Sequence, residues 1–478
     1  MVIGIDLWAI NCSRNHGIGN YAEEFCRELL RARPDDQYVF LNWSGERICE
    51  DLFGKDMPFQ EALVGDVSGL TESDTECVIR AFVSENRVDL YLDSSPVWGS
   101  RPLLKHTWFG EHTKLACIAF DLIPYVLREQ YYAYRDADGF KNYIKRMYNL
   151  SQYDYIYSIS NSTKSDIEKY VGIPGERIIT IYCSTGKTGH ERAISGESDI
   201  QERLHIDAGY FLYPAGDAVQ KNLSNLLLGY VEAAKACDTI PVLVITGKFF
   251  ARSRQMIDDI IASNNMEGKI ILTGFITEEE LDALYKECKW VLYPSIYEGF
   301  GMPVVEGWEH EKPVLTANGS SLVEIAEGAA VLVDPTRIEE IREGLLKITK
   351  MSEEERREFI EKGRERVKIF SWKNTVQRFI ESLEKMPVNA MSDKDSIDLN
   401  QKAKKRIDEE MAEWDEERTR RGIVEESAEK KQEKIRRYYA LLNRWMTARA
   451  QGLSIERYLI NNNFRKIALY GMGVMASH

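Results

Sequence analysis

The chain has 478 residues, 44% of them hydrophobic, and a formal net charge of −14 at pH 7. At roughly 150 residues per domain, this length predicts two or three domains, each able to bury a core. The negative charge disfavours non-specific binding to nucleic acid or to an anionic membrane.

The targeting signals and metal-binding patterns that a sequence can carry are not evident in this one. The N-terminal stretch MVIGIDLWAI lacks a basic region before its apolar residues, so we expect no signal peptide. No apolar run approaches the roughly 20 residues that span a bilayer. The eight cysteines form no CxxC pair, and the seven histidines show no HxH or HExxH spacing. We therefore expect a cytoplasmic protein with no metal, and leave open a peripheral contact with the inner membrane face.

In the first half, short apolar runs alternate with helical patterns, as in parallel strands buried on both faces. The expected helices include Tyr21–Arg31 and Ser162–Val171. The expected strands are Val2–Ile10, Tyr38–Trp43, Asp89–Asp93, Leu115–Phe120, Tyr155–Ile159 and Ile178–Tyr182.

The second half repeats this alternation. Its expected helices include Asn222–Ala236, Glu278–Glu287 and Trp372–Lys385, the last with Ser371 as N-cap. Its expected strands are Phe211–Tyr213, Val242–Thr246, Ile270–Leu272, Val291–Tyr293, Val314–Thr316 and Val331–Val333.

Alternating strands and helices predict an α/β fold with two Rossmann-like, doubly wound domains. We expect them at residues 1–185 and 186–386, because residues 184–209 are polar and poor in strand signals. Residues 387–437 are densely charged, which predicts a helical extension or linker, either a spacer or a hairpin for oligomerisation.

Residues 438–478 end in an expected strand, Arg465–Tyr470, followed by GMGVMA. This matches the GxGxxG/A turn of a dinucleotide-binding unit. We expect either the start of a further C-terminal module or an isolated glycine turn, and assign no site there.

The most informative stretch is YPSIYEGFGMPVVE, residues 293–306. A buried strand ends, Gly299 and Gly301 allow the backbone to approach a ligand, and a helix begins. A helix N-terminus suits a diphosphate, and the carboxylates of Glu298 and Glu306 can accept hydrogen bonds from sugar and ribose hydroxyls. Taken individually, Glu306 could be a carboxylate favoured by the helix dipole and Glu298 a surface loop residue.

Three further loops follow strand ends, where open parallel sheets bind ligands. After one strand come Gly216 and Lys221, a cation at a helix start that makes sense beside an anion. Gly17 and Gly19 form a glycine loop before the first expected helix, and Asp121 follows another strand, although it could be an N-cap. The DxD pattern at Asp136–Asp138 lacks a preceding apolar strand, so we expect a helix surface or turn rather than a metal site.

At these residues the sequence resembles the family 4 retaining glycosyltransferases, which have two facing Rossmann-like domains, the GT-B architecture. The resemblance covers roughly residues 1–385, and its most specific element is the E-x7-E pattern of Glu298 and Glu306. Further matches are the GIGNY loop, SNSTK at residues 160–164, Lys221-Asn222, and SSLVE at residues 320–324.

The resemblance implies an acceptor-binding first domain, a nucleotide-sugar-binding second domain and no metal cofactor. Glu298, Lys221 and Asp121 would be the catalytic residues, and the acceptor would be a glycan or a lipid-linked glycan. The donor would be bound by Gly17, Gly19, Gly216, Lys221, Gly299, Phe300, Gly301, Glu306, Ser320, Ser321 and Leu322. Two positions depart from the family pattern: Phe120 stands where many members have histidine, and Gln220 precedes the lysine where many have arginine.

Other function classes stay open from the sequence. Glu298 and Glu306 could be a glycosidase carboxylate pair, although a glycosidase has no diphosphate for Lys221 to hold. A nucleotide-sugar epimerase on the same architecture, or a non-catalytic donor-binding scaffold, would also use such a site.

Overall fold

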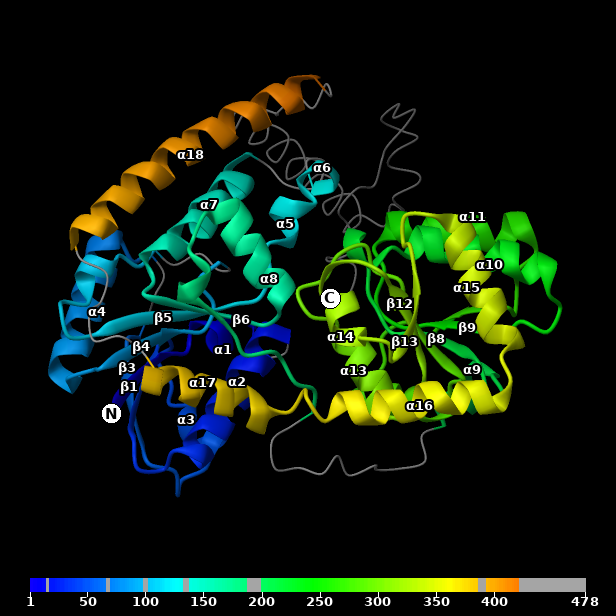
Figure 1. Cartoon of the computed structure of the whole chain (residues 1–478), viewed down its shortest axis with the longest axis horizontal. Coiled ribbons are helices and arrows are strands. Elements are labelled where there is room, and N and C mark those ends of the chain that lie inside the picture. Colours follow the sequence, from blue (N-terminus) through cyan, green and yellow to red (C-terminus); the bar gives the residue numbers. More distant parts are fainter. Residues whose placement is uncertain are drawn as a thin grey trace, which may run out of the picture. The chain divides into compact units, whose positions relative to one another are not determined.

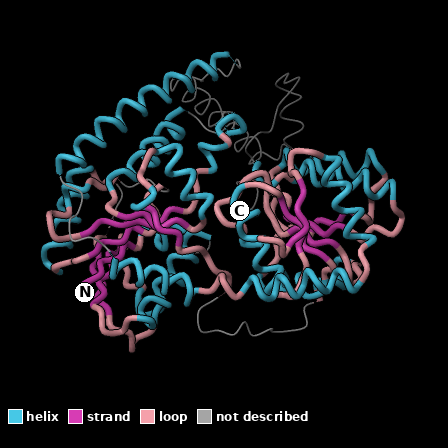
Figure 2. Tube along the Cα trace, viewed as in Figure 1, coloured by secondary structure: helices cyan, strands magenta, loops and turns pink. Residues whose placement is uncertain are grey.

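The computed structural model describes residues 1–13, 17–65, 69–97, 102–131, 137–186, 199–385 and 393–420. Residues 1–411 form one compact unit. Within it, the strands gather into two separate sheets flanked by helices (Figure 2). The expected two-domain α/β fold is thereby confirmed, whereas the segment 438–478 with its GMGVMA turn lies outside the described residues.

The first sheet, as far as the chain is described, has seven parallel strands in the order β3-β2-β1-β4-β5-β6-β7. Strand order reverses direction between β1 and β4, the topological switch point at which such sheets bind ligands. The strands are β1 (Val2–Asp6), β2 (Gln37–Asn42), β3 (Phe59–Leu63), β4 (Leu90–Asp93), β5 (Lys114–Ala119), β6 (Tyr155–Ser158) and β7 (Ile178–Thr180).

The second sheet has six parallel strands among the described residues, in the order β10-β9-β8-β11-β12-β13. Its switch point lies between β8 and β11. All four side chains of β11 are buried, as the apolar run WVLY predicts. The strands are β8 (Phe211–Tyr213), β9 (Leu243–Ile245), β10 (Ile270–Leu272), β11 (Trp290–Tyr293), β12 (Val314–Ala317) and β13 (Ala330–Val333).

Helices cover both faces of each sheet; α2 and α17 lie on one face of the first sheet, and α7 and α8 on the other (Figure 1). The helices that accompany the first sheet are α1 (Trp8–Ser13), α2 (Gly17–Ala32), α3 (Cys49–Phe53), α4 (Glu72–Asn86), α5 (Ile123–Val126), α6 (Arg128–Tyr131), α7 (Ala137–Asn149) and α8 (Asn161–Asp166). Those from the second half are α9 (Ile200–Leu204), α10 (Leu223–Ala236), α11 (Ala251–Asn264), α12 (Glu278–Glu287), α13 (Met302–Glu309), α14 (Ser320–Ala326), α15 (Ile338–Lys350), α16 (Glu353–Val367), α17 (Trp372–Lys385) and α18 (Asp393–Arg420).

Two elements of the first domain differ from expectation. The first apolar run does not continue as a strand to Ile10, because the Asp6 carboxylate accepts a 2.8 Å hydrogen bond from the Trp8 amide and α1 begins there. The apolar pattern does not predict strand β3. It is an edge strand with partly exposed side chains, so it lacks the continuous apolar run of the buried strands.

Helix α17 follows the second sheet in the chain but packs against α2 of the first. Tyr21 meets Trp372 edge-on at 5.1 Å between ring centroids, and Phe25 meets Phe379 at 5.2 Å. The expected cap is confirmed, since the Asn374 amide donates to Ser371 Oγ at 3.2 Å.

Residues 393–420 of the charged segment form α18, so a helical extension is confirmed. Arg406 donates to the carbonyl oxygen of Val171 at 3.1 Å, and the hydroxyl of Tyr125 donates to Glu410. In the part of the chain that the structure describes, no helix is both long and apolar enough to cross a membrane.

Candidate functional site

The Lys221 loop follows β8, one of the two strands at the second switch point. A 3₁₀ turn, Val219–Lys221, precedes α10, and Asn222 between them has a left-handed conformation with φ 65°. The Asn222 side chain donates to the carbonyl oxygens of Pro294 at 2.9 Å and Pro335 at 2.6 Å. This anchors the backbone beside Lys221 to the loop that leaves β11.

The Glu298 loop follows β11, the other strand at that switch point. The Ile296 amide donates to the carbonyl oxygen of Gln220 at 2.7 Å, which joins the two loops directly. Glu298 is buried, and its Oε1 lies 2.8 Å from Lys221 Nζ. The structure therefore brings the two expected catalytic groups into an ion pair at the predicted edge of the sheet.

The start of α14 braces the Glu298 loop. The Glu298 amide donates to Ser320 Oγ at 3.1 Å, and Ser321 Oγ lies 2.9 Å from the Glu298 carbonyl oxygen and 2.8 Å from that of Phe300. Ser320 has φ 52°, an uncommon conformation for a residue with a side chain. Ser320 and Ser321 thus fix the backbone that carries Glu298.

Glycine is required at Gly301, which has φ 114° and precedes α13. A Cβ there would lie 2.5 Å from Leu322 Cδ2. Phe300 is buried and meets Phe370 edge-on at 5.4 Å. Leu322 and Phe300 therefore serve packing beneath the loop.

Glu306 lies on α13 and accepts a 2.7 Å hydrogen bond from the hydroxyl of Tyr285 on α12. Its charge also reaches Tyr293: burial first, then Glu298, and less strongly Glu306, raise the pKa of Tyr293 well above its usual value. The hydrogen bond from Tyr285 thus ties the Glu306 side chain to α12.

Asp121 approaches this group from the first domain. Gly299 makes the approach possible, because a Cβ at that position would lie 2.5 Å from the Phe120 carbonyl oxygen and 2.9 Å from Asp121 Cβ. Burial raises the pKa of Asp121 to about 6, opposed by the hydrogen bond from the Ile123 amide; the charge of Glu298 raises it further and that of Lys221 lowers it.

The remaining expected positions are less closely tied to the ion pair. Gly17 and Gly19 lie in the first turn of α2 rather than in a loop, and residues 14–16 are outside the described part. Gly216 lies in the loop after β8, where a Cβ would meet no atom within 4 Å. The DxD pattern meets the start of α7, although Asp136 is outside the described residues.

Two contacts that we did not expect also reach the Glu298 loop. The hydroxyl of Tyr297 lies 2.9 and 2.8 Å from the two carboxylate oxygens of Asp166, which is buried on α8. Glu324 of α14 accepts hydrogen bonds from the amides of Asn161 at 2.9 Å and Ser162 at 3.1 Å. Both contacts join segments more than a hundred positions apart, and the sequence carries no local signal for either.

The second domain is similar in sequence to known glycosyltransferases. Residues 199–366 match the family model described as "Glycosyl transferases group 1". Over 276 residues the chain is 25% identical to the serotype-specific mannosyltransferase WbdA of Escherichia coli, covering 57% of this chain and 34% of that protein. It is also 25% identical over 234 residues to the O-antigen chain mannosyltransferase B of Escherichia coli, covering 48% and 61%.

The chain therefore spans 34% of the length of the first of these relatives. The solved structure of Anabaena Alr3699/HepE in complex with UDP and glucose shares the fold, with a TM-score of 0.56 at 13% identity over 80% of this chain and 99% of that one. The matched family model and these two relatives are glycosyltransferases, and the solved structure shares the two-domain fold.

Proposed function

We propose that this protein is a metal-independent, retaining glycosyltransferase that moves a sugar from a nucleoside-diphosphate sugar to a glycan or lipid-linked glycan. The observation that carries the proposal is the ion pair between Lys221 and Glu298, at the switch point of a sheet that matches the family model. The named mannosyltransferases among the relatives make mannose the first donor sugar to test, and O-antigen-like polysaccharide assembly the first setting. A cytoplasmic location belongs to the same proposal.

The donor side supplies complementary charges. The ammonium of Lys221 offsets the negative charge that grows on the leaving diphosphate. The N-terminus of α13 presents amides and a partial positive charge to the same group. Glu298 and Glu306 accept hydrogen bonds from hydroxyls of the sugar and the ribose, which fixes the orientation of the anomeric carbon.

The transfer breaks the bond between the anomeric carbon and the diphosphate oxygen. The acceptor oxygen bonds to that carbon on the same face, and its proton passes to the leaving phosphate oxygen, so the configuration is retained. Asp121 orients the acceptor hydroxyl from the first domain. No protein nucleophile takes part in this scheme.

The decisive test is a donor screen that reads nucleotide release from GDP-, UDP-, ADP- and dTDP-sugars, with and without glycan acceptors. Acceptor-dependent release supports transfer; release of sugar from a glycan without any nucleotide would support a glycosidase instead. Interconversion of the nucleotide sugar without release would identify an epimerase. Binding without turnover of any donor would support a scaffold.

The site assignment is tested with Lys221→Ala and Glu306→Ala. We expect each variant to lower transfer by about a hundredfold or more while the fold is retained. The matched control is Lys235→Ala, an exposed lysine on α10 whose ammonium contacts only Asn264 among the described residues. Near-normal transfer in both site variants would contradict the assignment.

A further inference from the structure

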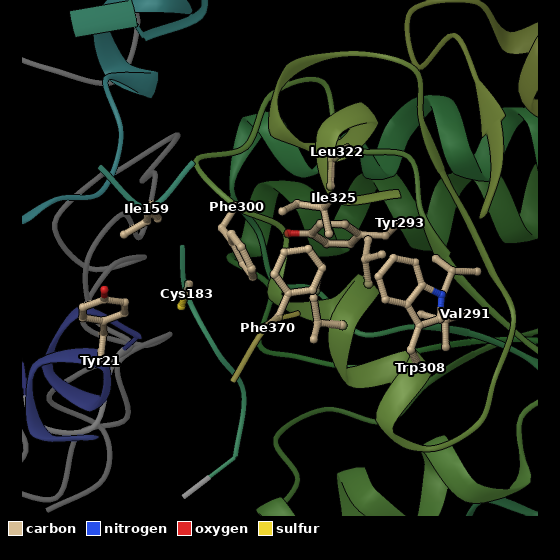
Figure 3. Packing of buried hydrophobic residues seen from close by; sticks show 14 of the residues in the cluster. Tyr21, Ile159, Cys183, Val291, Tyr293, Phe300, Trp308, Leu322, Ile325 and Phe370 are labelled. Carbon is tan, nitrogen blue, oxygen red and sulfur yellow. The ribbon is translucent and has the colours of Figure 1, made fainter. Parts of the chain in front are cut away.

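Tyr293 ends β11, and its ring lies among the buried side chains of the second domain (Figure 3). Its hydroxyl is nevertheless polar and meets two charged groups: Lys221 Nζ at 2.5 Å and Glu298 Oε1 at 2.8 Å. The ammonium lies beyond the hydroxyl rather than over the ring face, because Lys221 Nζ is 5.1 Å from the ring centroid but only 2.5 Å from the hydroxyl oxygen. Among the described residues, Tyr293 is thus the one side chain that forms hydrogen bonds with both members of the ion pair.

The contacts of Glu298 are unevenly divided between its two oxygens. Lys221, Tyr293 and Ser295 all reach Oε1, whereas no described residue donates a hydrogen bond to Oε2. Ser295 Oγ lies equally close, 2.6 Å, to Glu298 Oε1 and to the carbonyl oxygen of Gln220, and its single proton can serve only one of them. Lys221 and Tyr293 therefore donate to Oε1 whichever of its two acceptors Ser295 serves.

The Tyr293 hydroxyl and the Lys221 ammonium supply the protons for these contacts. The Tyr293 hydroxyl has one proton, which it gives to Glu298, and lone pairs that accept from Lys221. Burial raises the pKa of Tyr293, so the hydroxyl keeps its proton. The Lys221 ammonium has three protons, of which two are directed to Tyr293 and Glu298. In the described part of the chain, the third ammonium proton and Glu298 Oε2 have no hydrogen-bond partner, so both are left for a ligand.

We propose that Tyr293 is a positioning residue: its hydroxyl holds Lys221 so that the third N–H meets a diphosphate oxygen, and holds Glu298 so that Oε2 meets a hydroxyl of the donor sugar. The inference rests on the proposed function and assigns a role to a residue that touches no substrate. It is a case of preorganisation, in which a group that is already oriented loses little freedom when the ligand binds.

The test is Tyr293→Phe, which keeps the buried aromatic ring and removes only the hydroxyl. The matched control is Tyr230→Phe. The Tyr230 hydroxyl bonds to the carbonyl oxygens of Pro241 and Lys269, which lie at the amino ends of β9 and β10, whereas the proposed site lies at the carboxyl ends of the strands. We expect kcat to fall by about ten- to a hundredfold in Tyr293→Phe and to stay near wild type in Tyr230→Phe. In a Lys221→Met background, Tyr293→Phe should lower kcat much less, because its effect passes largely through the lysine.

A second readout does not depend on activity. At a fixed pH, acetic anhydride should acetylate Lys221 about fivefold faster in Tyr293→Phe than in wild type, since the ammonium has lost one hydrogen-bond acceptor. Equal acetylation rates, or equal kcat losses with and without Lys221, would overturn the positioning role. If wild type released no nucleotide from any donor while the acetylation rate rose as expected, the proposed function would fail and the positioning contact would stand.

Discussion

Gly299→Ala directly tests the close approach between the Glu298 loop and the Phe120–Asp121 segment that follows β5. In Gly299→Ala, the new methyl group would lie 2.5 Å from the Phe120 carbonyl oxygen and 2.9 Å from Asp121 Cβ. A backbone oxygen cannot rotate away, so one of the two loops must shift. The backbone at Gly299 is not left-handed, which leaves the steric clash as the main effect.

The magnitude follows from two opposing terms. Overpacking costs about 1–3 kcal/mol, and replacing glycine stiffens the unfolded chain, which returns about 0.4–1 kcal/mol. The net loss of about 1–2 kcal/mol corresponds to a melting temperature lowered by about 2–8 °C for domains of this size. Because the loop also carries Glu298, a shift of about 1 Å should lower kcat by about a hundredfold.

Thermal unfolding and nucleotide-release kinetics measure the two effects. The control is Gly45→Ala, where a methyl group would meet no atom within 4 Å and the backbone is equally permissive. We expect this control to melt at or slightly above the wild-type temperature, with unchanged kcat. If Gly299→Ala behaved like Gly45→Ala in both assays, the close approach of Asp121 to the Glu298 loop would be refuted.

Two further predictions concern the carboxyl groups of the first domain. Burial raises the pKa of both Asp121 and Asp166 to about 6, so both are ionised above that pH and protonated below it. Transfer should therefore fall as the pH drops through about 6. Asp121→Asn should remove this acid limb of the pH profile. Asp166→Asn should move the limb to lower pH, because the negative charge of Asp166 raises the pKa of Asp121. An unchanged limb in initial-rate profiles of Asp121→Asn would contradict the role of that residue. Tyr297→Phe removes the hydroxyl that stabilises the buried Asp166 carboxylate, so above pH 7 we expect an unfolding free energy lower by about 1–3 kcal/mol in denaturant titrations, and no change would contradict the contact.

Much of the architecture was predictable because it depends on local patterns. The six expected strands of the second sheet are all present, since each is a short apolar run that only a doubly covered sheet can bury. The prediction of the first sheet was less complete. It missed β3, because an edge strand need not be apolar. It also extended the first strand into α1, which begins where the Asp6 carboxylate accepts a hydrogen bond from the Trp8 amide.

The candidate site, too, was predictable only in part. The sequence placed Lys221 and Glu298 at strand ends, and parallel topology then brings such ends to one edge of the sheet. Their 2.8 Å contact agrees with that expectation, whereas the donor-binding roles given to Gly17, Gly19 and Gly216 stay predictions.

The sequence by itself determined the repeating strand–helix order and the loops in which polar groups follow buried strands. Both features depend only on residues that are close together in the sequence. Only the tertiary structure decided that α17 returns to pack on α2, that Tyr297 reaches Asp166 across 131 positions, and that Tyr293 joins the ion pair through its hydroxyl. Local periodicity says which face of an element is buried. It does not say which distant element covers that face, because many partners bury the same apolar area and only the packing of the whole chain selects one.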